Sequence, residues 1–220
     1  SFTLGGDDTL CGNSLVIEAG PAQSIAWGIS INNGATQSFN TPSVTLNAQG
    51  GAPTEFDISV IINTLYCGNG SDQATIMLVP DATLDSSLHI CADETGTLAP
   101  GGGTSATYAW STGEATSSID VTEAGTYTVS KSELGCESDA TIQVTQSVGV
   151  SLSDIDACED DGPVSIDATI PDGSSYAWSG GGSNNTAVNT FTADGSYTVT
   201  ATDNFGCVST DGFNLLILGA

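Results

Sequence analysis

The sequence predicts an all-β chain built from three tandem β-sandwich domains. Two observations support this prediction: a block of similar sequence recurs along the chain, and apolar and polar residues alternate within each block. The composition agrees, since glycine is abundant (27 residues), aromatic residues make up only 6%, and no segment has the spacing of an amphipathic helix. A length of 220 residues alone would suggest one or two domains, and the repeat overrides that estimate in favour of three small ones.

The repeat is clearest in the second half of the chain. Residues 107–136 and 175–207 both contain Tyr-Ala-Trp-Ser, a glycine-rich turn, Gly-x-Tyr-Thr-Val and a Gly-Cys pair. An earlier cysteine, Cys91 or Cys158, precedes each tryptophan. One unit is therefore defined by the order of cysteine, tryptophan, alternating strand and second cysteine.

The first unit keeps this order but not the spacing. Cys11 is followed by Trp27, by an alternating segment over residues 56–60 and by Cys67. The interval from tryptophan to second cysteine is longer than in the other two units. We expect the additional residues, around Gly34–Gly51, to form an added hairpin or a long loop.

Period-two alternation predicts the strands inside each unit. Residues 126–131, 141–144 and 197–201 alternate between two kinds of side chain and are rich in Thr, Val and Ile. Gly, Asn, Asp and Ser punctuate these runs as turn residues. Several short strands with regular turns are typical of a β-sandwich.

The domain boundaries are predicted where one alternating strand ends and another begins. These places are Pro80–Asp81 and Gln146–Val148. The predicted domains are residues 1–80 (a divergent domain with an insert), 81–147 and 148–220.

The six cysteines are expected to close the domains covalently. No CxxC pair occurs and only one histidine is present, so a zinc site is not indicated. A unit of about 70 residues buries only ~60% of its unfolded surface, and one disulfide adds roughly 3–4.5 kcal/mol. We expect pairing within domains, with pairing between domains as the alternative. The expected pairs are Cys11–Cys67, Cys91–Cys136 and Cys158–Cys207.

Charge and cysteine content together predict a secreted protein. The chain has 26 acidic residues and one basic residue, Lys131, so its net charge is −25. This charge repels phosphate backbones and anionic lipid, which argues against nucleic-acid and acidic-membrane partners. Paired cysteines indicate an oxidising compartment, and no apolar run approaches the ~18 residues of a membrane span. The chain starts without a methionine or a leader, so we expect a processed form or a fragment of an extracellular protein.

The repeat residues resemble a known domain family. Trp-Ser-Thr-Gly-Glu-Ala-Thr-Ser-Ser-Ile-Asp-Val, followed by Ala-Gly-Thr-Tyr-Thr-Val and Gly-Cys, resembles the PKD/Ig-like repeats of Bacteroidota cell-surface proteins, which include gliding-motility adhesins and related secreted cargo. The resemblance is close over residues 81–210 and looser over 1–80, and the Trp-Asp-Phe-Gly-Asp turn of the PKD pattern is missing. It implies immunoglobulin-like/PKD-like β-sandwiches with an adhesive or filament-forming role and no catalytic residues. It also implies that Trp27, Trp110 and Trp178 pack in the cores.

Catalysis has little support in the sequence. His89 is the only histidine, and we expect it to be a hydrogen-bonded strand residue rather than a general base. A hydrolase that uses two carboxylates is the formal alternative, and turnover by the isolated chain would be needed to support it. We therefore predict a protein that is not an enzyme.

Acidic residues near the two predicted domain junctions are candidate calcium ligands. Carboxylate oxygens near an interdomain hinge can hold Ca²⁺ and stiffen the connection. The alternative is a solvated acidic surface. Calcium is the one cofactor that the sequence suggests. The candidate ligands are Asp81, Asp85, Asp154, Asp156, Glu159, Asp160 and Asp161.

Three positions match glycosylation motifs. Residues 69–71 and 184–186 are N-glycosylation sequons. Residues 8–10 fit the Asp-Thr-apolar pattern of O-glycosylation that the resemblance makes relevant. The alternative in each case is an ordinary loop residue. The candidate acceptors are Thr9, Asn69 and Asn184.

Apolar segments occur at both ends of the chain, Phe2–Leu4 and Phe213–Leu218. Either they complete their own sandwiches, or one end adds a strand to a neighbouring subunit and builds a head-to-tail filament. The leading hypothesis is a structural repeat module of a bacterial surface adhesin or filament, which associates with itself or with other surface-protein domains. The alternative is a carbohydrate- or ligand-binding module of a larger secreted protein, which an exposed row of aromatic side chains would favour.

Overall fold

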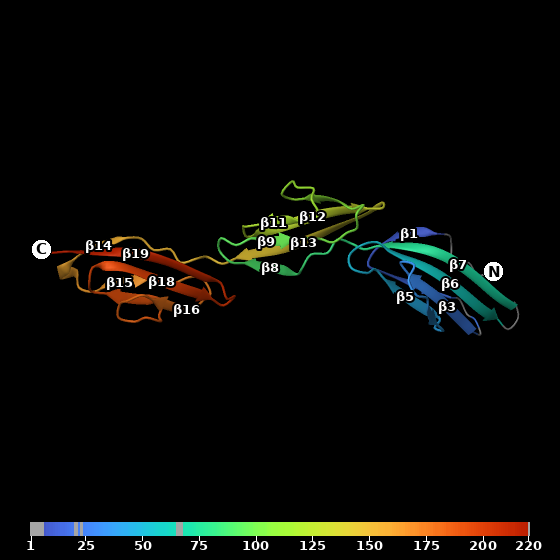
Figure 1. Cartoon of the computed structure of the whole chain (residues 1–220), viewed down its shortest axis with the longest axis horizontal. Helices are drawn as coiled ribbons and strands as arrows, with labels where there is room; N and C mark the ends of the chain where they lie inside the picture. Colours follow the sequence, from blue (N-terminus) through green and yellow to red (C-terminus); the bar gives the residue numbers. More distant parts are fainter. Residues whose placement is uncertain (1–6, 20–21, 23, 65–67, 220) are drawn as a thin grey trace. The chain divides into compact units, whose positions relative to one another are not determined.

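The computed structural model of the chain describes residues 7–19, 22, 24–64 and 68–219 (Figure 1). In these residues the regular structure is almost entirely strand, with one short 3₁₀-helix, which confirms the all-β prediction. The chain separates into two compact units. The first unit comprises Ser1–Ser86, Thr97–Ile119 and Thr126–Ile142, and the second comprises Ser87–Gly96, Asp120–Gly125 and Gln143–Ala220.

A sandwich of two sheets forms the N-terminal part of the first unit. Its larger sheet has the order β1-β7-β6-β3-β4, and its smaller sheet pairs β2 with β5. β1 runs parallel to β7, whereas the other pairs are antiparallel. The strands are β1 (Asp8–Cys11), β2 (Ser14–Glu18), β3 (Ser24–Ile31), β4 (Gln37–Phe39), β5 (Ser43–Asn47), β6 (Thr54–Thr64) and β7 (Gly68–Val79).

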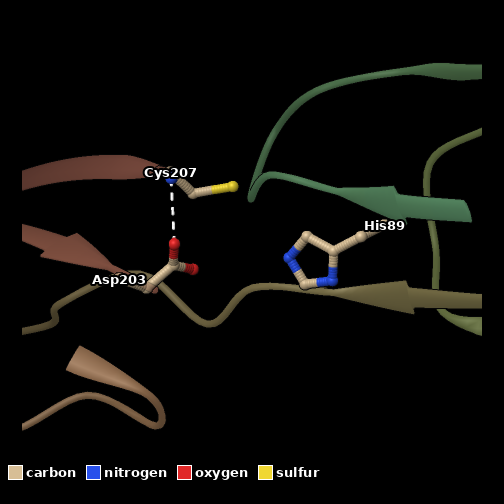
Figure 2. A group of neighbouring side chains, drawn as sticks. All are labelled: His89, Asp203 and Cys207. Carbon is tan, nitrogen blue, oxygen red and sulfur yellow. Dashed lines mark hydrogen bonds between the residues drawn. The ribbon is translucent and has the colours of Figure 1, made fainter. Parts of the chain in front are cut away.

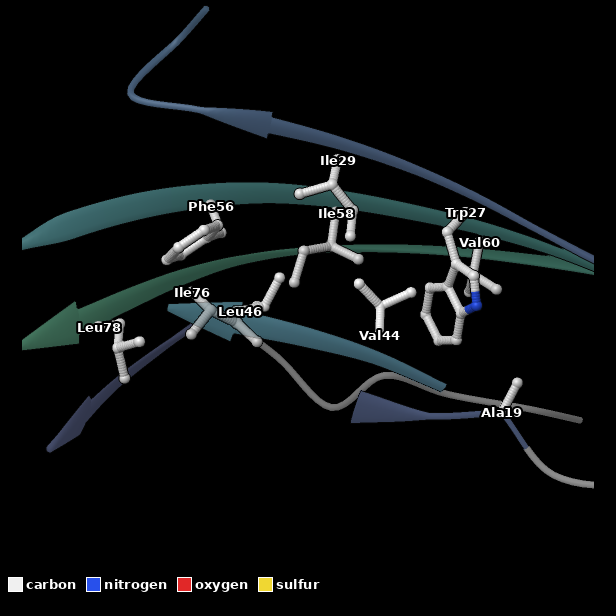
Figure 3. Close-up of a cluster of buried hydrophobic side chains, with 10 residues drawn as sticks. All are labelled: Ala19, Trp27, Ile29, Val44, Leu46, Phe56, Ile58, Val60, Ile76 and Leu78. Atoms are coloured by element: carbon white, nitrogen blue, oxygen red, sulfur yellow. The ribbon is translucent and has the colours of Figure 1, made fainter. Parts of the chain in front are cut away.

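Alternating apolar side chains bring these two sheets together. Along β6, Phe56, Ile58 and Val60 are buried, and the residues between them are more exposed. Val44 and Leu46 of β5 contribute from the smaller sheet, and Figure 3 shows these side chains in one cluster with those of the larger sheet. A strand with period-two alternation buries one face, and full burial of one such side chain is worth about 1.5–3 kcal/mol.

The predicted insert of the first domain has a different structure from the one expected. The segment around Gly34–Gly51 contains β4 and β5, which do not pair with each other. β4 joins β3 in the larger sheet, and β5 joins β2 in the smaller one. The expected added hairpin or long loop is therefore wrong. The reason is the alternation Ser-Val-Thr-Leu-Asn in β5, which buries two residues in the core.

The next strands form a sheet of order β10-β12-β13-β8 and a second sheet that pairs β11 with β9. β10 runs antiparallel to β12, and the last four residues of β13 run parallel to β8. The predicted strands at residues 126–131 and 141–144 lie in β12 and β13. The elements are β8 (Ser87–Ile90), β9 (Gly96–Leu98), β10 (Thr107–Trp110), β11 (Ile119–Val121), β12 (Gly125–Glu133) and β13 (Cys136–Gln146).

The C-terminal part of the second unit repeats this plan. Its sheets have the orders β14-β19-β18-β16 and β15-β17, and β14 runs parallel to β19. Trp178, Phe191, Val199 and Phe213 lie in one core cluster between them. The elements are β14 (Ile155–Cys158), η1 (Glu159–Asp161), β15 (Val164–Asp167), β16 (Gly173–Trp178), β17 (Val188–Phe191), β18 (Gly195–Asp203) and β19 (Val208–Leu218).

The described residues therefore form three tandem immunoglobulin-like sandwiches, as the sequence predicts. β7 ends at Val79 and β13 ends at Gln146, beside the predicted boundaries. The two compact units divide the chain at other places. The domain limits 1–80, 81–147 and 148–220 thus stay a prediction.

Candidate functional site: the disulfide junctions

Two disulfides are present in the part of the chain that the structure describes, and neither is an expected pair. Cys11 is bonded to Cys136 within the first unit, and Cys91 is bonded to Cys207 within the second. Cys158 is a free, exposed thiol, and Cys67 lies outside the described residues. The predicted pairs Cys11–Cys67, Cys91–Cys136 and Cys158–Cys207 are therefore wrong.

The length of the last strand explains why cysteines of one sandwich do not pair. Cys158 lies opposite Leu218, at the end of β19, whereas Cys207 directly precedes the start of the same strand. β19 has 11 residues, and at about 3.4 Å per residue its ends are roughly 34 Å apart. A disulfide requires its two Cα atoms to lie within about 7 Å. The early cysteine of one sandwich bonds instead to the late cysteine of the next, which also explains why each sandwich has one of each.

The hairpin before β13 brings Cys136 to its place. Leu134 and Gly135 both have positive φ angles, 50° and 84°. Two consecutive residues of this kind form the tight turn that suits a β-hairpin, and glycine adopts that backbone without strain. The next residue, Cys136, is buried at the start of β13, with its Cα 5.4 Å from that of Cys11.

The only lysine of the chain lies buried at this first junction. The Nζ of Lys131 donates a hydrogen bond to the carbonyl of Pro80 at 2.7 Å and lies 3.4 Å from the Oε2 of Glu133. The Oε1 of Glu133 accepts hydrogen bonds from the N–H of Gly103 at 2.8 Å and from the hydroxyl of Ser105 at 3.3 Å. The one cation thus fixes the segment that follows β7.

Hydrogen bonds from side chains also hold the backbone of that segment. The N–H of Asp81 donates to the Oδ1 of Asn13 at 3.1 Å, and the Nδ2 of Asn13 donates to the Asp81 carboxylate at 3.4 Å. The N–H of Ala82 donates to the hydroxyl of Ser138 at 2.8 Å. Asn13 and Ser138 each lie two residues after a bonded cysteine, so the disulfide and these contacts act on the same segment.

At the second junction a buried aspartate, Asp203, accepts several hydrogen bonds. Its Oδ1 accepts from the N–H groups of Phe205 and Cys207, both at 2.9 Å, and its Oδ2 accepts from the hydroxyl of Ser147. The Ser147 bond is the largest cause that lowers the pKa of Asp203 below its usual range; burial opposes it, and the two N–H groups and nearby His89 assist it. The negative charge is thereby held between the hairpin and the residue after β13.

His89 packs beside this carboxylate on β8 (Figure 2). Its two ring nitrogens lie 2.8 Å from the hydroxyls of Thr145 and Ser147. The ring stacks on Phe205 with 3.8 Å between ring centroids. The expectation of a hydrogen-bonded strand histidine is confirmed.

His89, Asp203 and Cys207 also form the one group of three potential metal-ligand residues found in the described residues, with donor atoms within 4.8 Å of one another. The donors do not suit a metal, however. The sulfur of Cys207 is bonded to Cys91, and both nitrogens of His89 have hydroxyl partners. These side chains hold the junction together.

The two junctions share a sequence pattern that the sequence analysis missed. In each, a buried acidic residue ends the long strand before the hairpin: Glu133 precedes Cys136, and Asp203 precedes Cys207. A serine, Ser138 or Ser209, lies two residues after the cysteine. Ser209 accepts a hydrogen bond from the N–H of Val150 at 3.0 Å, as Ser138 does from the N–H of Ala82. An acidic residue three or four positions before a cysteine, with a serine two positions after the cysteine, is visible in the sequence.

The predicted calcium ligands have other partners or lie exposed. Asp81 bonds to Asn13, and the Oδ1 of Asp154 accepts from the backbone N–H of Asn214 at 2.7 Å and from its side chain at 3.1 Å. These bonds, the backbone one first, lower the pKa of Asp154. Among the described residues the seven carboxylates do not form a compact group of three, so calcium binding stays a prediction. The exposed members are Asp85, Asp154, Asp156, Glu159, Asp160 and Asp161.

The candidate glycosylation acceptors are all exposed. Thr9 lies on β1, Asn69 on β7 and Asn184 in the turn between β16 and β17. Modification of these residues stays a prediction.

Each tryptophan is buried in a core, as expected. In addition, each indole N–H donates a hydrogen bond of 2.8–2.9 Å to the carbonyl of a threonine in the segment before the next strand of the smaller sheet. The donor–acceptor pairs are Trp27 with Thr41, Trp110 with Thr116 and Trp178 with Thr186. The same contact in all three sandwiches fixes the entry of that strand.

The two terminal apolar segments differ in what the structure describes. Phe213–Leu218 is part of β19, which pairs with β18 and β14 and so completes its own sandwich. Phe2–Leu4 lies outside the described residues. None of the described helices has the length and apolar character needed to span a bilayer.

A polar hollow of about 360 Å³ lies on the face of the larger first sheet. Asp57 lines it and accepts hydrogen bonds from the hydroxyls of Ser30 and Thr75, both at 3.1 Å. Its lining contains no aromatic residue. Among the large exposed hydrophobic side chains of the described residues, Phe205 is the one aromatic. The aromatic row that would favour carbohydrate binding is thus not found in that part of the chain.

No protein-family model matches the chain, and no curated protein matches it by sequence. Among solved structures it is similar to Drosophila OTK extracellular domains 3–5, with 11% identity over 97% of this chain and 94% of that chain and a TM-score of 0.38. It is also similar to the N-terminal four Ig domains of Dscam1 isoform 7.44 (9% identity, 96% and 71% coverage, TM-score 0.31). A third similar structure is that of SGBP-B from the Bacteroides ovatus mixed-linkage glucan utilization locus in complex with a mixed-linkage heptasaccharide. It has 14% identity over 97% of this chain and 66% of that chain, with a TM-score of 0.26. These similarities concern the fold alone.

Proposed function

We propose that this chain is a structural module of an extracellular, adhesion-type surface protein, in which disulfides join consecutive sandwiches. The observation that carries the proposal is the pairing of an early cysteine with the late cysteine of the next sandwich, seen at both junctions. Such bonds persist in oxidising environments and are rare in reducing ones. A chain with this pattern of disulfides is suited to an oxidising environment outside the cell.

The side chains at the junctions support a holding role. The polar side chains there form hydrogen bonds or ion pairs with backbone groups, hydroxyls or each other; they are Lys131, Glu133, His89 and Asp203. A catalytic group needs access to a substrate proton, whereas these groups are occupied by the protein itself. The acidic surface adds solubility and resistance to aggregation.

The finer proposal is a repeat module of a bacterial adhesin or filament that associates with copies of itself or with other surface domains. It draws on the sequence resemblance and on the open edges of the sheets. β14 is an edge strand of its sheet, and Leu216 and Leu218 of the neighbouring β19 are about half exposed. An unpaired edge of this kind is a template for an added strand.

The test is made on native cell-surface material. Intact cells are treated with protease and with a membrane-impermeant thiol reagent, and the chain is then mapped by mass spectrometry without reduction. We expect surface cleavage and linked peptides for both observed disulfides. A chain that is protected from the protease, with its cysteines recovered as thiols, would overturn the proposal. Immunolabelled electron microscopy with and without EDTA then distinguishes calcium-dependent filaments from dispersed molecules.

A further inference from the structure

The free thiol of Cys158 occupies the position of a bonded cysteine in another sandwich. Cys11 ends the short strand β1 and lies opposite Val79, the last residue of β7. Cys158 ends the short strand β14 and lies opposite Leu218, the last residue of β19. In both cases the short strand runs parallel to the long last strand of the same sandwich (Figure 1).

Cys91 follows the same rule with a shift of one residue. Ile90 ends β8 and lies opposite Gln146, the last residue of β13, so Cys91 comes directly after the last pair. Cys11, Cys91 and Cys158 are thus the same structural position in three consecutive sandwiches. The first two are bonded, and their bonds are evidence of what this position does that is independent of Cys158 itself.

The surroundings of Cys158 keep the position accessible. Its side chain is exposed, as is that of Cys11, although Cys11 is bonded. The N–H of Cys158 donates to the Asp161 carboxylate at 3.2 Å in the 3₁₀-turn that follows. In both observed bonds the partner is the buried cysteine that opens or directly precedes the last strand of the next sandwich.

We infer that Cys158 forms the same disulfide with the late cysteine of a following sandwich of this type. That sandwich belongs either to a second copy of this chain or to a longer form of the same chain. In a second copy that cysteine is Cys67, which follows Trp27 in the sequence as Cys136 follows Trp110. Cys67 is identified from its place in the sequence only.

The bond-forming step balances with a disulfide oxidant. Each of the two thiols gives up one proton and one electron, the S–S bond forms, and the oxidant disulfide is reduced to two thiols. A thiolate attacks a disulfide sulfur through a mixed disulfide, so an exposed thiol is the suitable first reactant. The inference rests on the proposed function in one respect, the oxidising compartment.

Peptide mapping of native material decides the inference. Free thiols are alkylated under denaturing conditions, and the digest is analysed without reduction. We expect Cys158 in a linked pair, either with Cys67 or with a cysteine of a following sandwich. Alkylated Cys158, or Cys158 capped by a small thiol, together with intact Cys11–Cys136 and Cys91–Cys207 links, would overturn the inference and leave the proposed function standing. Recovery of all cysteines as thiols would contradict both this inference and the proposed function.

The purified chain identifies the source of the partner. In a buffer of reduced and oxidised glutathione, a second copy as partner gives a ladder of covalent multimers on a non-reducing gel. Cys158→Ser is expected to abolish that ladder, whereas Asp156→Ser on the same exposed strand is the matched control and keeps it. Multimers that persist in Cys158→Ser, or a Cys67–Cys158 link at monomer mass, would refute the second-copy arm. A chain that stays monomeric, with Cys158 linked in native material, assigns the partner to a longer chain.

Discussion

At the scale of single residues, the buried pair of Lys131 and Glu133 is the most sensitive point of the first junction. Both side chains are almost fully buried, and they form a salt bridge with each other. Removing one partner of a buried pair leaves an uncompensated charge, which costs about 3–5 kcal/mol. Glu133→Ala is therefore expected to lower the free energy of unfolding by that amount, as measured by chemical denaturation.

Two variants make this test specific to the buried pair. Glu137→Ala removes an exposed acid from the next strand and is expected to change stability by no more than about 0.5 kcal/mol. Lys131→Met combined with Glu133→Gln removes both charges and is expected to recover part of the loss. Equal destabilisation by Glu133→Ala and Glu137→Ala would contradict the role of the pair.

Asp203 makes the second junction sensitive to acid. The pKa of an aspartate in an unfolded chain is about 3.9, and the bond from Ser147 lowers the pKa of Asp203 in the folded chain. The stability that this residue contributes is therefore complete above about pH 4 and is lost as the pH falls through the lower folded-state pKa. In Asp203→Asn the fall of Tm with acid is expected to be shallower than in the wild type.

Thermal unfolding followed by circular dichroism across the acid range checks this expectation. Asp160→Asn removes an exposed charge from η1 and serves as the control for net charge. Parallel acid profiles of Asp203→Asn and the wild type would show that the hydrogen bonds to Asp203 add nothing to stability.

At the scale of elements, the contact between tryptophan and threonine ties the two sheets of each sandwich. Trp178→Phe removes the N–H that reaches the Thr186 carbonyl at 2.8 Å and leaves that carbonyl without this donor. An unsatisfied buried partner costs about 1–3 kcal/mol. We expect a loss of that size in denaturant unfolding monitored by circular dichroism, whereas Val208→Thr at an exposed site of β19 stays within about 0.5 kcal/mol. A loss as small in Trp178→Phe as in the control would argue against the contact.

The long strands could be predicted from the sequence, and the short parallel ones could not. β12 and β18 carry period-two alternation around Tyr-Thr-Val, which is a strong local signal. β1 and β14 have only four residues each, and their place is set by parallel pairing with the distant ends of β7 and β19. Such pairing has no local signature.

The sequence showed where the cysteines lie in each unit, but the disulfide partner of each cysteine could not be predicted from it. Counting one early and one late cysteine per unit is compatible with bonds inside a sandwich and with bonds between sandwiches. The choice depends on the roughly 34 Å that the last strand places between its two ends, where Cys158 and Cys207 lie. The burial of Glu133 and Asp203 could not be predicted either, because an acidic residue at the end of a strand is normally exposed.

At the scale of the whole molecule, the two disulfides are expected to contribute substantially to stability. They join residues 125 and 116 positions apart, and native disulfides in small extracellular domains typically contribute about 2–5 kcal/mol each. Cys91→Ser with Cys207→Ser is expected to lower the unfolding free energy by this amount in denaturant. Asp156→Ser, which changes an exposed residue and leaves both disulfides intact, is the control. An unchanged midpoint in the double variant would contradict the stabilising role of the link.

The net charge of −25 predicts a marked dependence on salt. Like charges repel over ~8 Å at physiological ionic strength and over ~3 Å at 1 M, so Tm is expected to rise with added NaCl. Calcium and magnesium chloride at equal ionic strength separate screening from binding. A Tm increase with Ca²⁺ beyond that with Mg²⁺ supports the predicted calcium ligands. Equal increases would leave charge screening as the whole effect.

The overlap of the two disulfide loops sets how far the chain can be stretched. A pulling force applied at the ends crosses from Cys11 to Cys136, returns through the sequence to Cys91 and crosses again to Cys207. Between the outer cysteines it meets only 45 residues (136 − 91) instead of 196 (207 − 11). At about 3.3–3.6 Å per residue, the unfolded span is roughly 150–160 Å. Oxidised, the molecule is a tether whose span between the outer cysteines cannot exceed that length, and cutting both bonds would raise the limit about fourfold.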